Sequence, residues 1–248
     1  MKNTLSRIGV VAARVLNQLH RDRRFVAISI LFPLIIIYFI KLVFDVLAPP
    51  SFNISPYAVP YAAFIVHFIA FILTAIVLVR ERTAGTMAQM FVSGYQQIEI
   101  IIGYLLAYTV LATAQSLLVL LELNWLFDLG FSLAQFASMY LVMWLLAVIS
   151  MAIGMLVSNF ARNEGQVFPF IPLVILSVIL SGIIVPVEKL PDWAQVISYL
   201  TPLFYANEVL QELIAGGGLL DDWVMFVILP IYGLIVVGIA TISLREKD

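Results

Sequence analysis

The chain contains no cysteine. Disulfides, thiolate catalysis and cysteine-based metal sites are therefore excluded, and cysteine usage says nothing about the redox compartment. Charged residues are also scarce, at 11% of the 248 residues, whereas a soluble domain carries about a quarter. Together with a hydrophobic content of 63%, this scarcity of charge indicates a chain that is built for a bilayer.

The common motifs of nucleotide binding and hydrolysis are missing as well. The sequence has no GxxxxGK[ST] loop, so it does not bind ATP in that way, and it has neither HExxH nor GxSxG. Its two histidines, His20 and His67, are far apart. His67 lies within an apolar stretch, where it is either a packing or interhelix hydrogen-bonding group or a residue with a direct role. We expect no catalytic residue, cofactor site or metal site in this chain, and no enzymatic activity.

Six long apolar stretches dominate what is present. They run over residues 25–46, 57–79, 98–121, 133–157, 167–187 and 224–244. Each reaches the roughly 20 residues that a helix needs to cross about 30 Å of hydrocarbon. The first is too long for the core of a signal peptide and no cleavage pattern follows it, so we expect it to be retained as a span. The sequence predicts an all-α membrane protein with six transmembrane helices in a single domain, residues 1–248.

Basic residues occupy alternate breaks between these stretches. Of the 13 Lys and Arg residues, all but Lys41 and Lys189 precede the first stretch or follow an even-numbered one. The positive-inside rule then places both termini in the cytoplasm of a cell whose inner membrane holds the chain. Residues 223–248 are predicted to form the sixth span and a cytoplasmic tail.

Residues 1–24 form a predicted amphipathic helix. Apolar residues recur at spacings of three and four: Leu5, Ile8, Ala12, Val15 and Leu19. Arginines form a separate stripe: Arg7, Arg14 and Arg21. Such a helix is suited to lie along the inner membrane surface with its arginines near lipid phosphates. It serves either as an anchor alone or as a contact for a partner.

The cytoplasmic break after the second stretch contains a short predicted helix. Thr86 and Gln89 fit a capping box at its start, and Gly94 is placed to end it in the left-handed conformation. Its apolar residues share one face, which we expect to be exposed: Met87, Met90 and Phe91. This face either enters a groove of a partner or rests on the lipid headgroups.

The outer segment before the last span, residues 188–222, is too apolar for a free loop and too interrupted for a span. Pro191 suits the first position of one helix, and Thr201 with Pro202 suits the start of a second that runs to Ile214. The first has an apolar face that we expect to pack inward: Trp193, Val196, Ile197 and Leu200. The acids are expected mostly to meet water or the outer interface: Glu188, Asp192, Glu208 and Glu212. A re-entrant helical hairpin fits this pattern, because irregular backbone at membrane depth must be protected by protein or by a wet cavity.

Two of these segments carry a resemblance to a known family. The stretch ERTAGTMAQM at 81–90, followed by IEIIIGY at 98–104, resembles the E-R-x-x-G-T-x-x-Q/E signature of ABC-2 type transporter permeases. The stretch SGIIVPVEKLP at 181–191, with ISYLTP at 197–202, resembles the outer re-entrant segment of that family. The resemblance extends over the whole chain and is closest to the drug- and antibiotic-export branch.

The resemblance implies a permease subunit of an ATP-driven exporter for a lipophilic or amphiphilic substrate. It implies a separate ABC ATPase, which holds ATP and Mg, and a second permease chain, identical or different; membrane lipids are further partners, and nucleic acid is not. It also implies a cytoplasmic coupling helix that contacts the ATPase: Glu81, Gly85, Thr86, Met87, Gln89, Met90 and Phe91. The implied outer gate comprises Pro186, Glu188, Pro191, Trp193, Thr201 and Pro202.

Other functions stay open at this point. A non-transporting assembly or sensing subunit could couple to an ATPase in the same way. An ion-gradient carrier would require paired acids or broken helices at mid-membrane, and an intramembrane lipid enzyme would require His, Asp or Glu chemistry near one interface. The sequence shows neither of these last two patterns.

Overall fold

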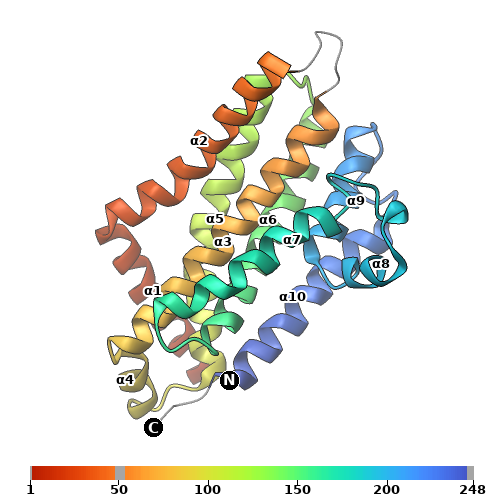
Figure 1. The fold of residues 1–248 in the computed structure, drawn as a ribbon. Helices are drawn as coiled ribbons and strands as arrows, with labels where there is room; N and C mark the ends of the chain where they lie inside the picture. The colour runs from red at the N-terminus through yellow and green to blue at the C-terminus, as the bar shows by residue number, and fades with distance from the viewer. Residues whose placement is uncertain (1, 48–53, 245–248) are drawn as a thin grey trace.

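The computed structural model describes residues 2–47 and 54–244, and every regular element in these ranges is a helix (Figure 1). Five helices are long and apolar enough to cross a membrane: α2 (Arg23–Leu47), α3 (Ser55–Thr83), α5 (Gln97–Phe127), α6 (Leu133–Ser158) and α10 (Trp223–Ser243). They correspond to the first, second, third, fourth and sixth predicted spans. The chain is therefore a multi-pass membrane protein.

Shorter helices connect or flank these five. They are α1 (Lys2–Arg21), α4 (Thr86–Val92), α7 (Ile171–Leu180), α8 (Asp192–Ser198) and α9 (Pro202–Ile214). Two short 3₁₀ segments accompany them, Glu164–Phe170 and Val187–Lys189. The predicted cytoplasmic tail, residues 245–248, lies outside the described residues.

The fifth predicted span differs from the expectation of one helix over residues 167–187. The segment begins as the 3₁₀ helix Glu164–Phe170, continues as α7 and ends at Leu180, so it falls short of the length of the other spans. Pro169 lies inside the 3₁₀ segment, and Gly182 after α7 adopts a left-handed φ of +84°. The ten residues of regular α-helix cover about 15 Å, half of the hydrocarbon thickness.

The centre of the bundle is the packed pair α3 and α6. Gly154 of α6 permits this approach: a Cβ there would lie 2.2 Å from Thr74 Oγ1 and 2.4 Å from the carbonyl oxygen of Phe71, both on α3. Small residues let membrane helices approach closely in this way. Gly154 thus marks the close packing of α6 against α3.

Helix α1 packs along the N-terminal half of α5. A Cβ on Gly103 of α5 would lie 2.6 Å from Val11 of α1, so this glycine also marks a close approach. Val11, Val15 and Leu19 are buried in the contact, whereas Leu5 is exposed. The predicted apolar face of α1 is thus buried against protein only in its second half.

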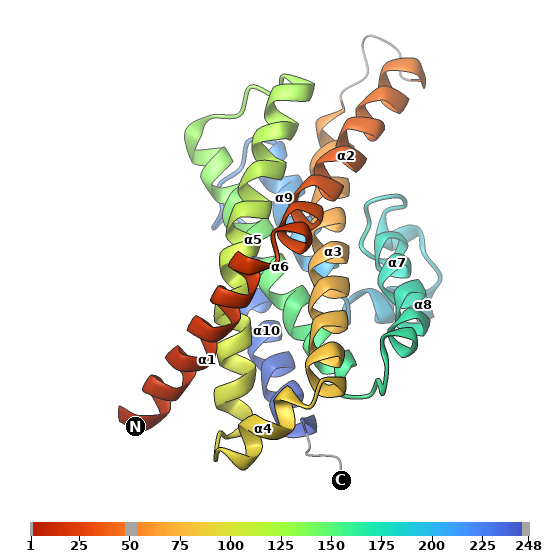
Figure 2. The same cartoon turned by 90° about the vertical axis from the view of Figure 1, so that its left-hand side faces the viewer.

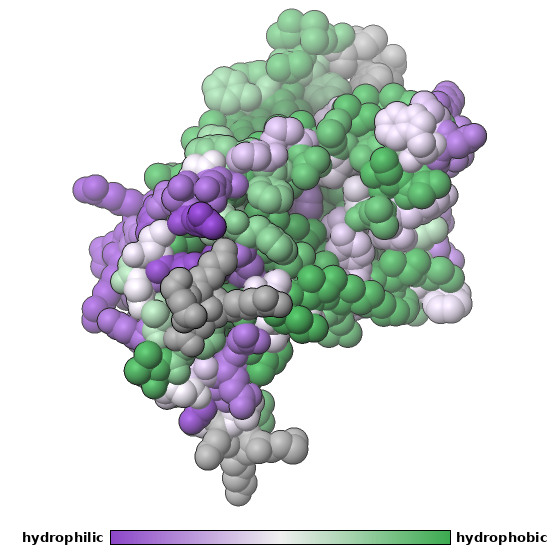
Figure 3. Space-filling model, turned by 60° about the horizontal axis from the view of Figure 1, so that its bottom comes forward, coloured by the Kyte–Doolittle hydropathy of each residue, from purple (hydrophilic) through white to green (hydrophobic). Residues whose placement is uncertain are grey.

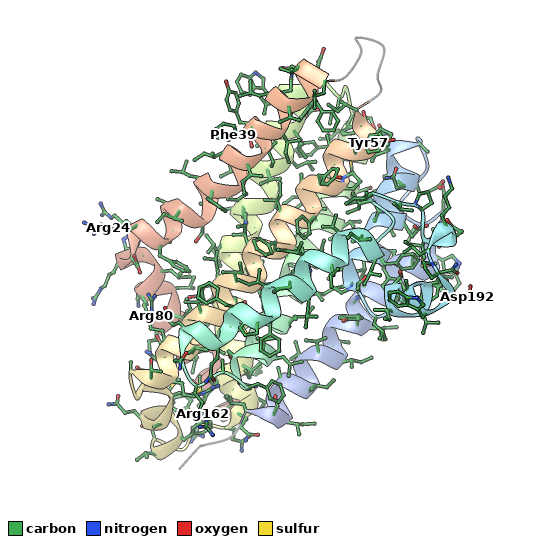
Figure 4. All side chains as sticks on the ribbon, in the orientation of Figure 1. Arg24, Phe39, Tyr57, Arg80, Arg162 and Asp192 are labelled. Atoms are coloured by element: carbon green, nitrogen blue, oxygen red, sulfur yellow. The ribbon has the colours of Figure 1, made fainter. Side chains whose placement is uncertain are left out.

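One end of the bundle carries basic and other hydrophilic residues. The start of α1, α4 and the end of α10 lie at the same end in both ribbon views (Figures 1 and 2). Arg80 and Arg162 lie at this end, whereas Asp192 lies on the far side of the molecule (Figure 4). Seen from below, hydrophilic residues gather at one side of this end and hydrophobic residues cover the adjoining flank (Figure 3). Two of the arginines that follow even-numbered stretches, Arg80 and Arg162, thus lie at the end of the bundle that holds α4.

Candidate coupling site and outer segment

Helix α4 lies between α3 and α5 and is bounded by two glycines. Gly85, with φ +73°, is the residue before its first turn, and Thr86 is its first helical residue. The predicted capping box is therefore wrong, because Thr86 is inside the helix and no side chain caps its start. Glycine holds this position because it adopts positive φ without steric cost.

The end of α4 matches the prediction. Gly94 has φ +80°, its N–H donates to the Phe91 carbonyl at 2.8 Å, and the N–H of Tyr95 donates to the Met90 carbonyl at 3.1 Å. This pair of hydrogen bonds is a Schellman motif, which satisfies the last carbonyls of the helix. The α4 segment is thus a short helix with a defined end and not an irregular loop.

The apolar face of α4 points into the protein's own bundle. Met87 and Met90 are buried in the core, and Phe91 is half-buried against it, so the expected exposure of this face is wrong. The exposed residues include Gln89 and Val92, and Val92 is 85% exposed. Any partner of α4 would therefore meet this outer face.

Glu81, at the end of α3, holds α1 in place. Its carboxylate is buried and accepts hydrogen bonds from Arg14 Nη2 at 2.7 Å and from Gln18 Nε2 at 2.8 Å. Partial burial alone would lower the pKa of Arg14, but the neighbouring Tyr104 and Glu81 raise it. Arg14 therefore stays charged, and the pair with Glu81 is a charge-assisted hydrogen bond.

A second arginine of α1 reaches the far end of α4. Arg7 Nη1 donates to the Gly94 carbonyl at 2.6 Å and lies 3.6 Å from the buried carboxylate of Glu99. Glu99 in turn accepts from the N–H of Gln96 at 2.9 Å and so caps the start of α5. Arg7 was predicted on the polar stripe of α1, but its partners are more than 80 residues away in the sequence, so the pattern could not identify them.

Arg82 connects the same segment to the opposite side of the bundle. Its Nη1 donates to the carbonyls of Ser158 at 2.6 Å and Ala161 at 3.1 Å, and its Nη2 donates to Asn159 Oδ1 at 3.0 Å. The amide of Asn159 then donates to the Ala240 carbonyl of α10 at 2.8 Å. The guanidinium thus binds acceptors at the end of α6, which lack partners within the helix.

These contacts make α4 part of one connected polar assembly. Glu81 links the end of α3 to α1, Arg82 links it to α6 and α10, and Arg7 links α1 to the end of α4. A displacement of α4 would therefore act on three parts of the bundle. The structure brings all seven residues of the predicted coupling segment to this end of the molecule.

The outer segment contains the two predicted short helices, with small differences at their starts. Pro191 precedes α8 as its N-cap residue instead of occupying the first turn. Pro202 is the first residue of α9 and Thr201 its N-cap residue, as predicted. The Thr201 hydroxyl donates back to the Ser198 carbonyl at 2.8 Å and does not cap α9.

The apolar face of α8 points outward, contrary to the prediction. Trp193 is 67% exposed and Leu200, just after α8, is 68% exposed, whereas Ala194 and Ser198 are buried. The large residues therefore face what surrounds the chain, and the small ones permit a close approach to the bundle. In a bilayer this orientation is allowed, because lipid solvates large apolar side chains as well as a core does.

Helix α9 is the buried half of the outer segment. Asn207 Nδ2 donates to the Ser181 carbonyl at 2.9 Å, and Gln211 Nε2 donates to the Pro56 carbonyl at 2.8 Å. Glu188, which follows Pro186, is exposed together with Asp192 and Glu212, whereas Glu208 is half-buried. Burial raises the pKa of Glu208, and the charges of Glu188 and Asp222 raise it further.

The arrangement described above agrees with comparisons of the chain with known proteins. The sequence profile of the ABC-2 type transporter matches residues 6–214. The chain belongs to the ABC-2 type transporter family. This family forms the membrane-spanning permease part of ABC transporters.

Curated relatives within this family are permeases or larger ABC transporters. The chain is 26% identical to the "Probable multidrug ABC transporter permease YbhR" of Escherichia coli K12 over 151 residues, which is 60% of this chain and 41% of that protein. It is 27% identical to the "Linearmycin resistance permease protein LnrN" of Bacillus subtilis over 146 residues, 58% of this chain and 37% of that protein. It is 24% identical to "ABC transporter G family member 20" of Dictyostelium discoideum over 180 residues, 71% of this chain and 24% of that protein. The matched regions thus span about two fifths or less of these relatives.

Proposed function

We propose that the chain is the permease subunit of an ATP-driven exporter and that it moves a lipophilic or amphiphilic substrate outward. The ABC-2 family and the names of the relatives YbhR and LnrN support this proposal. In this account a separate ABC ATPase hydrolyses ATP on the cytoplasmic side, and two permease chains form the path. Both termini face the cytoplasm of an inner membrane.

The observation that carries the proposal is the position of α4. This two-turn helix lies at the end of the bundle where Arg80 and Arg162 lie. Hydrogen bonds of Glu81, Arg82 and Arg7 connect the residues around it to α1, α6 and α10. A helix that only rested on lipid headgroups would not require these charge-assisted links. We assign the outer face of α4, with Gln89 and Val92, as the surface that the ATPase contacts.

The outer segment is assigned as the gate at the exit of the path. Its supports are the interruption at Thr201–Pro202 and the exposed Trp193, which a second permease chain or lipid could cover. The residues previously named for this gate, from Pro186 to Pro202, lie in one contiguous part of the molecule, away from α4.

The test is reconstitution. The chain is purified with the ATPase that co-purifies with it and is incorporated into liposomes, and ATP-dependent movement of a fluorescent lipophilic cation is measured. Transport that requires ATP, ATPase and permease together is expected. ATP hydrolysis with no movement of any of a panel of lipophilic and amphiphilic probes would instead identify a non-transporting subunit.

A further inference from the structure

A small cavity lies within the single chain, away from α4, where α3, α6, α7 and α10 meet the turn between α8 and α9. Its volume is about 180 Å³. This is smaller than a typical drug site of about 300–1,000 Å³. It is larger than the volume that several water molecules occupy in the liquid, at about 30 Å³ each. It therefore suits one end of a larger molecule rather than a whole one.

His67 of α3 is the polar group at the cavity wall that lies deepest in the protein. The residue is 3% exposed, and its Nδ1 lies 2.6 Å from Ser150 Oγ on α6. The hydrogen bond between two helices is the packing role that the sequence allowed for this histidine. The other ring nitrogen, Nε2, makes no hydrogen bond to the described part of the chain, and His67 lines the cavity.

The hydrogen bonds of Ser150 determine the tautomer of His67. The Ser150 hydroxyl donates to the Leu146 carbonyl, and its one hydrogen is thereby used. Ser150 Oγ must then accept from His67, so Nδ1 carries the ring proton. In the neutral ring, Nε2 consequently carries a free lone pair and can act as a hydrogen-bond acceptor toward the cavity.

The hydroxyl groups around the cavity are hydrogen-bond acceptors, like Nε2 of His67. Ser177, Thr201 and Tyr232 each donate their one hydrogen to a backbone carbonyl, of Val174 at 2.6 Å, Ser198 at 2.8 Å and Leu200 at 2.9 Å respectively. Each oxygen can therefore only accept a further hydrogen bond. The polar side chains of the cavity thus offer acceptors and no donor.

The remaining wall is apolar and reaches the outside of the chain. Leu173 of α7 is 62% exposed and Leu200 is 68% exposed, so these two residues form a rim on the flank of the bundle. An occupant can enter from this flank, which the surrounding bilayer or a second permease chain faces.

We propose that this cavity binds the hydroxyl-bearing end of a lipophilic molecule, which donates a hydrogen bond to Nε2 of His67. An alcohol or phenol group supplies the donor, and the adjoining hydrocarbon fills the apolar wall. If the chain is an exporter, the cavity defines its substrate class as lipophilic molecules with a hydroxyl group. That extension rests on the proposed function, whereas the binding itself does not.

The experiment measures binding to the purified permease in detergent, without an ATPase. The photoreactive alcohol 3-azioctanol is attached by light, and mass spectrometry locates the label. Two isomers compete with it, 1-octanol and heptyl methyl ether, which differ in that only the first has a donor. We expect label on cavity residues, and competition by 1-octanol that is about two- to tenfold stronger, as one hydrogen bond predicts.

Two variants test the assigned residues. His67→Phe keeps an aromatic ring without the acceptor, and it should reduce the ratio between the two competitors to about one. Leu173→Trp fills the rim from an exposed position and should abolish the label, whereas Leu176→Trp, at an exposed leucine of the same helix outside the cavity, should retain it. Leu173→Trp keeps the test valid if His67→Phe does not fold.

Equal competition by the two isomers, or undiminished labelling of Leu173→Trp, would overturn the inference. Failure of the reconstituted complex to transport would contradict the proposed function and leave this binding result unaffected. The two proposals can therefore fail independently.

Discussion

At the scale of single residues, the neighbours Glu81 and Arg82 show how one dipeptide serves two contacts. Successive helical residues project about 100° apart, so Glu81 faces α1 while Arg82 faces the end of α6. The sequence indicated these residues only through a resemblance, because their partners lie more than 60 positions away. Long-range pairing of this kind follows from tertiary packing and leaves no local signal in the sequence.

Replacing Arg82 by lysine should destabilise the protein. A lysine ammonium is a point charge and cannot reproduce the planar fork with which Arg82 reaches Ser158, Ala161 and Asn159. We expect a loss of about 1–3 kcal/mol in the free energy of unfolding in detergent. Arg80→Lys is the matched control, because the Arg80–Glu164 pair is exposed, and it should change stability by less than about 0.5 kcal/mol. Equal unfolding curves for the two variants would contradict the assigned role of Arg82.

Glu208 should make stability depend on pH. Its pKa in the folded protein is raised by burial and by Glu188 and Asp222, so the folded state holds this proton more tightly than the unfolded state. Stability is then lost as pH rises from the ordinary carboxyl pKa through the raised one. Glu208→Gln should therefore raise the unfolding temperature at neutral pH and have little effect below about pH 4. Glu212→Gln, at an exposed position one turn away, is the control; an unchanged melting profile of Glu208→Gln would contradict the assignment.

At the scale of elements, length and composition predicted five of the six spans but not the direction of their faces. In water, an apolar face indicates the core, whereas in a bilayer the lipid-facing and core-facing surfaces are both apolar. The predictions for α4 and α8 were wrong in opposite directions. Met87 and Met90 pack into their own bundle, and Trp193 points away from it. A glycine at a helix contact, such as Gly154, is a more direct signal, because only close packing requires a small residue there.

Gly154 provides a test of that signal. A Cβ at this position would lie 2.4 Å from a backbone oxygen of α3, which cannot move without displacing the helix. Gly154→Ala should therefore separate α3 from α6 and cost about 1–3 kcal/mol of stability in an unfolding titration. Gly238→Ala in α10 is the control, because a Cβ there meets no atom within 4 Å. Similar stability of the two variants would show that α3 and α6 are not in close contact.

At the scale of the whole molecule, the distribution of arginine predicted which elements share one end, and the ends of α3 and α6 do lie together. The membrane orientation itself is tested by labelling, since the chain has no cysteine of its own. Ser93→Cys and Asp192→Cys each place one thiol at an exposed position. In intact cells an impermeant reagent should label the cysteine at 192 and not the one at 93. The reverse pattern would invert the proposed topology.

The central claim is that an ATPase drives this permease through the outer face of α4. Val92 is 85% exposed on that face, so Val92→Glu should fold normally while placing a charge in the proposed interface. Leu133→Glu is the control, at a position of equal exposure, 85%, at the other end of the bundle. ATP-dependent transport and ATPase co-purification are measured for both at matched membrane levels. We predict at least a tenfold loss for Val92→Glu, because desolvating an unpaired charge costs about 3–5 kcal/mol, and no loss for Leu133→Glu. Unchanged co-purification and transport in Val92→Glu would contradict the account.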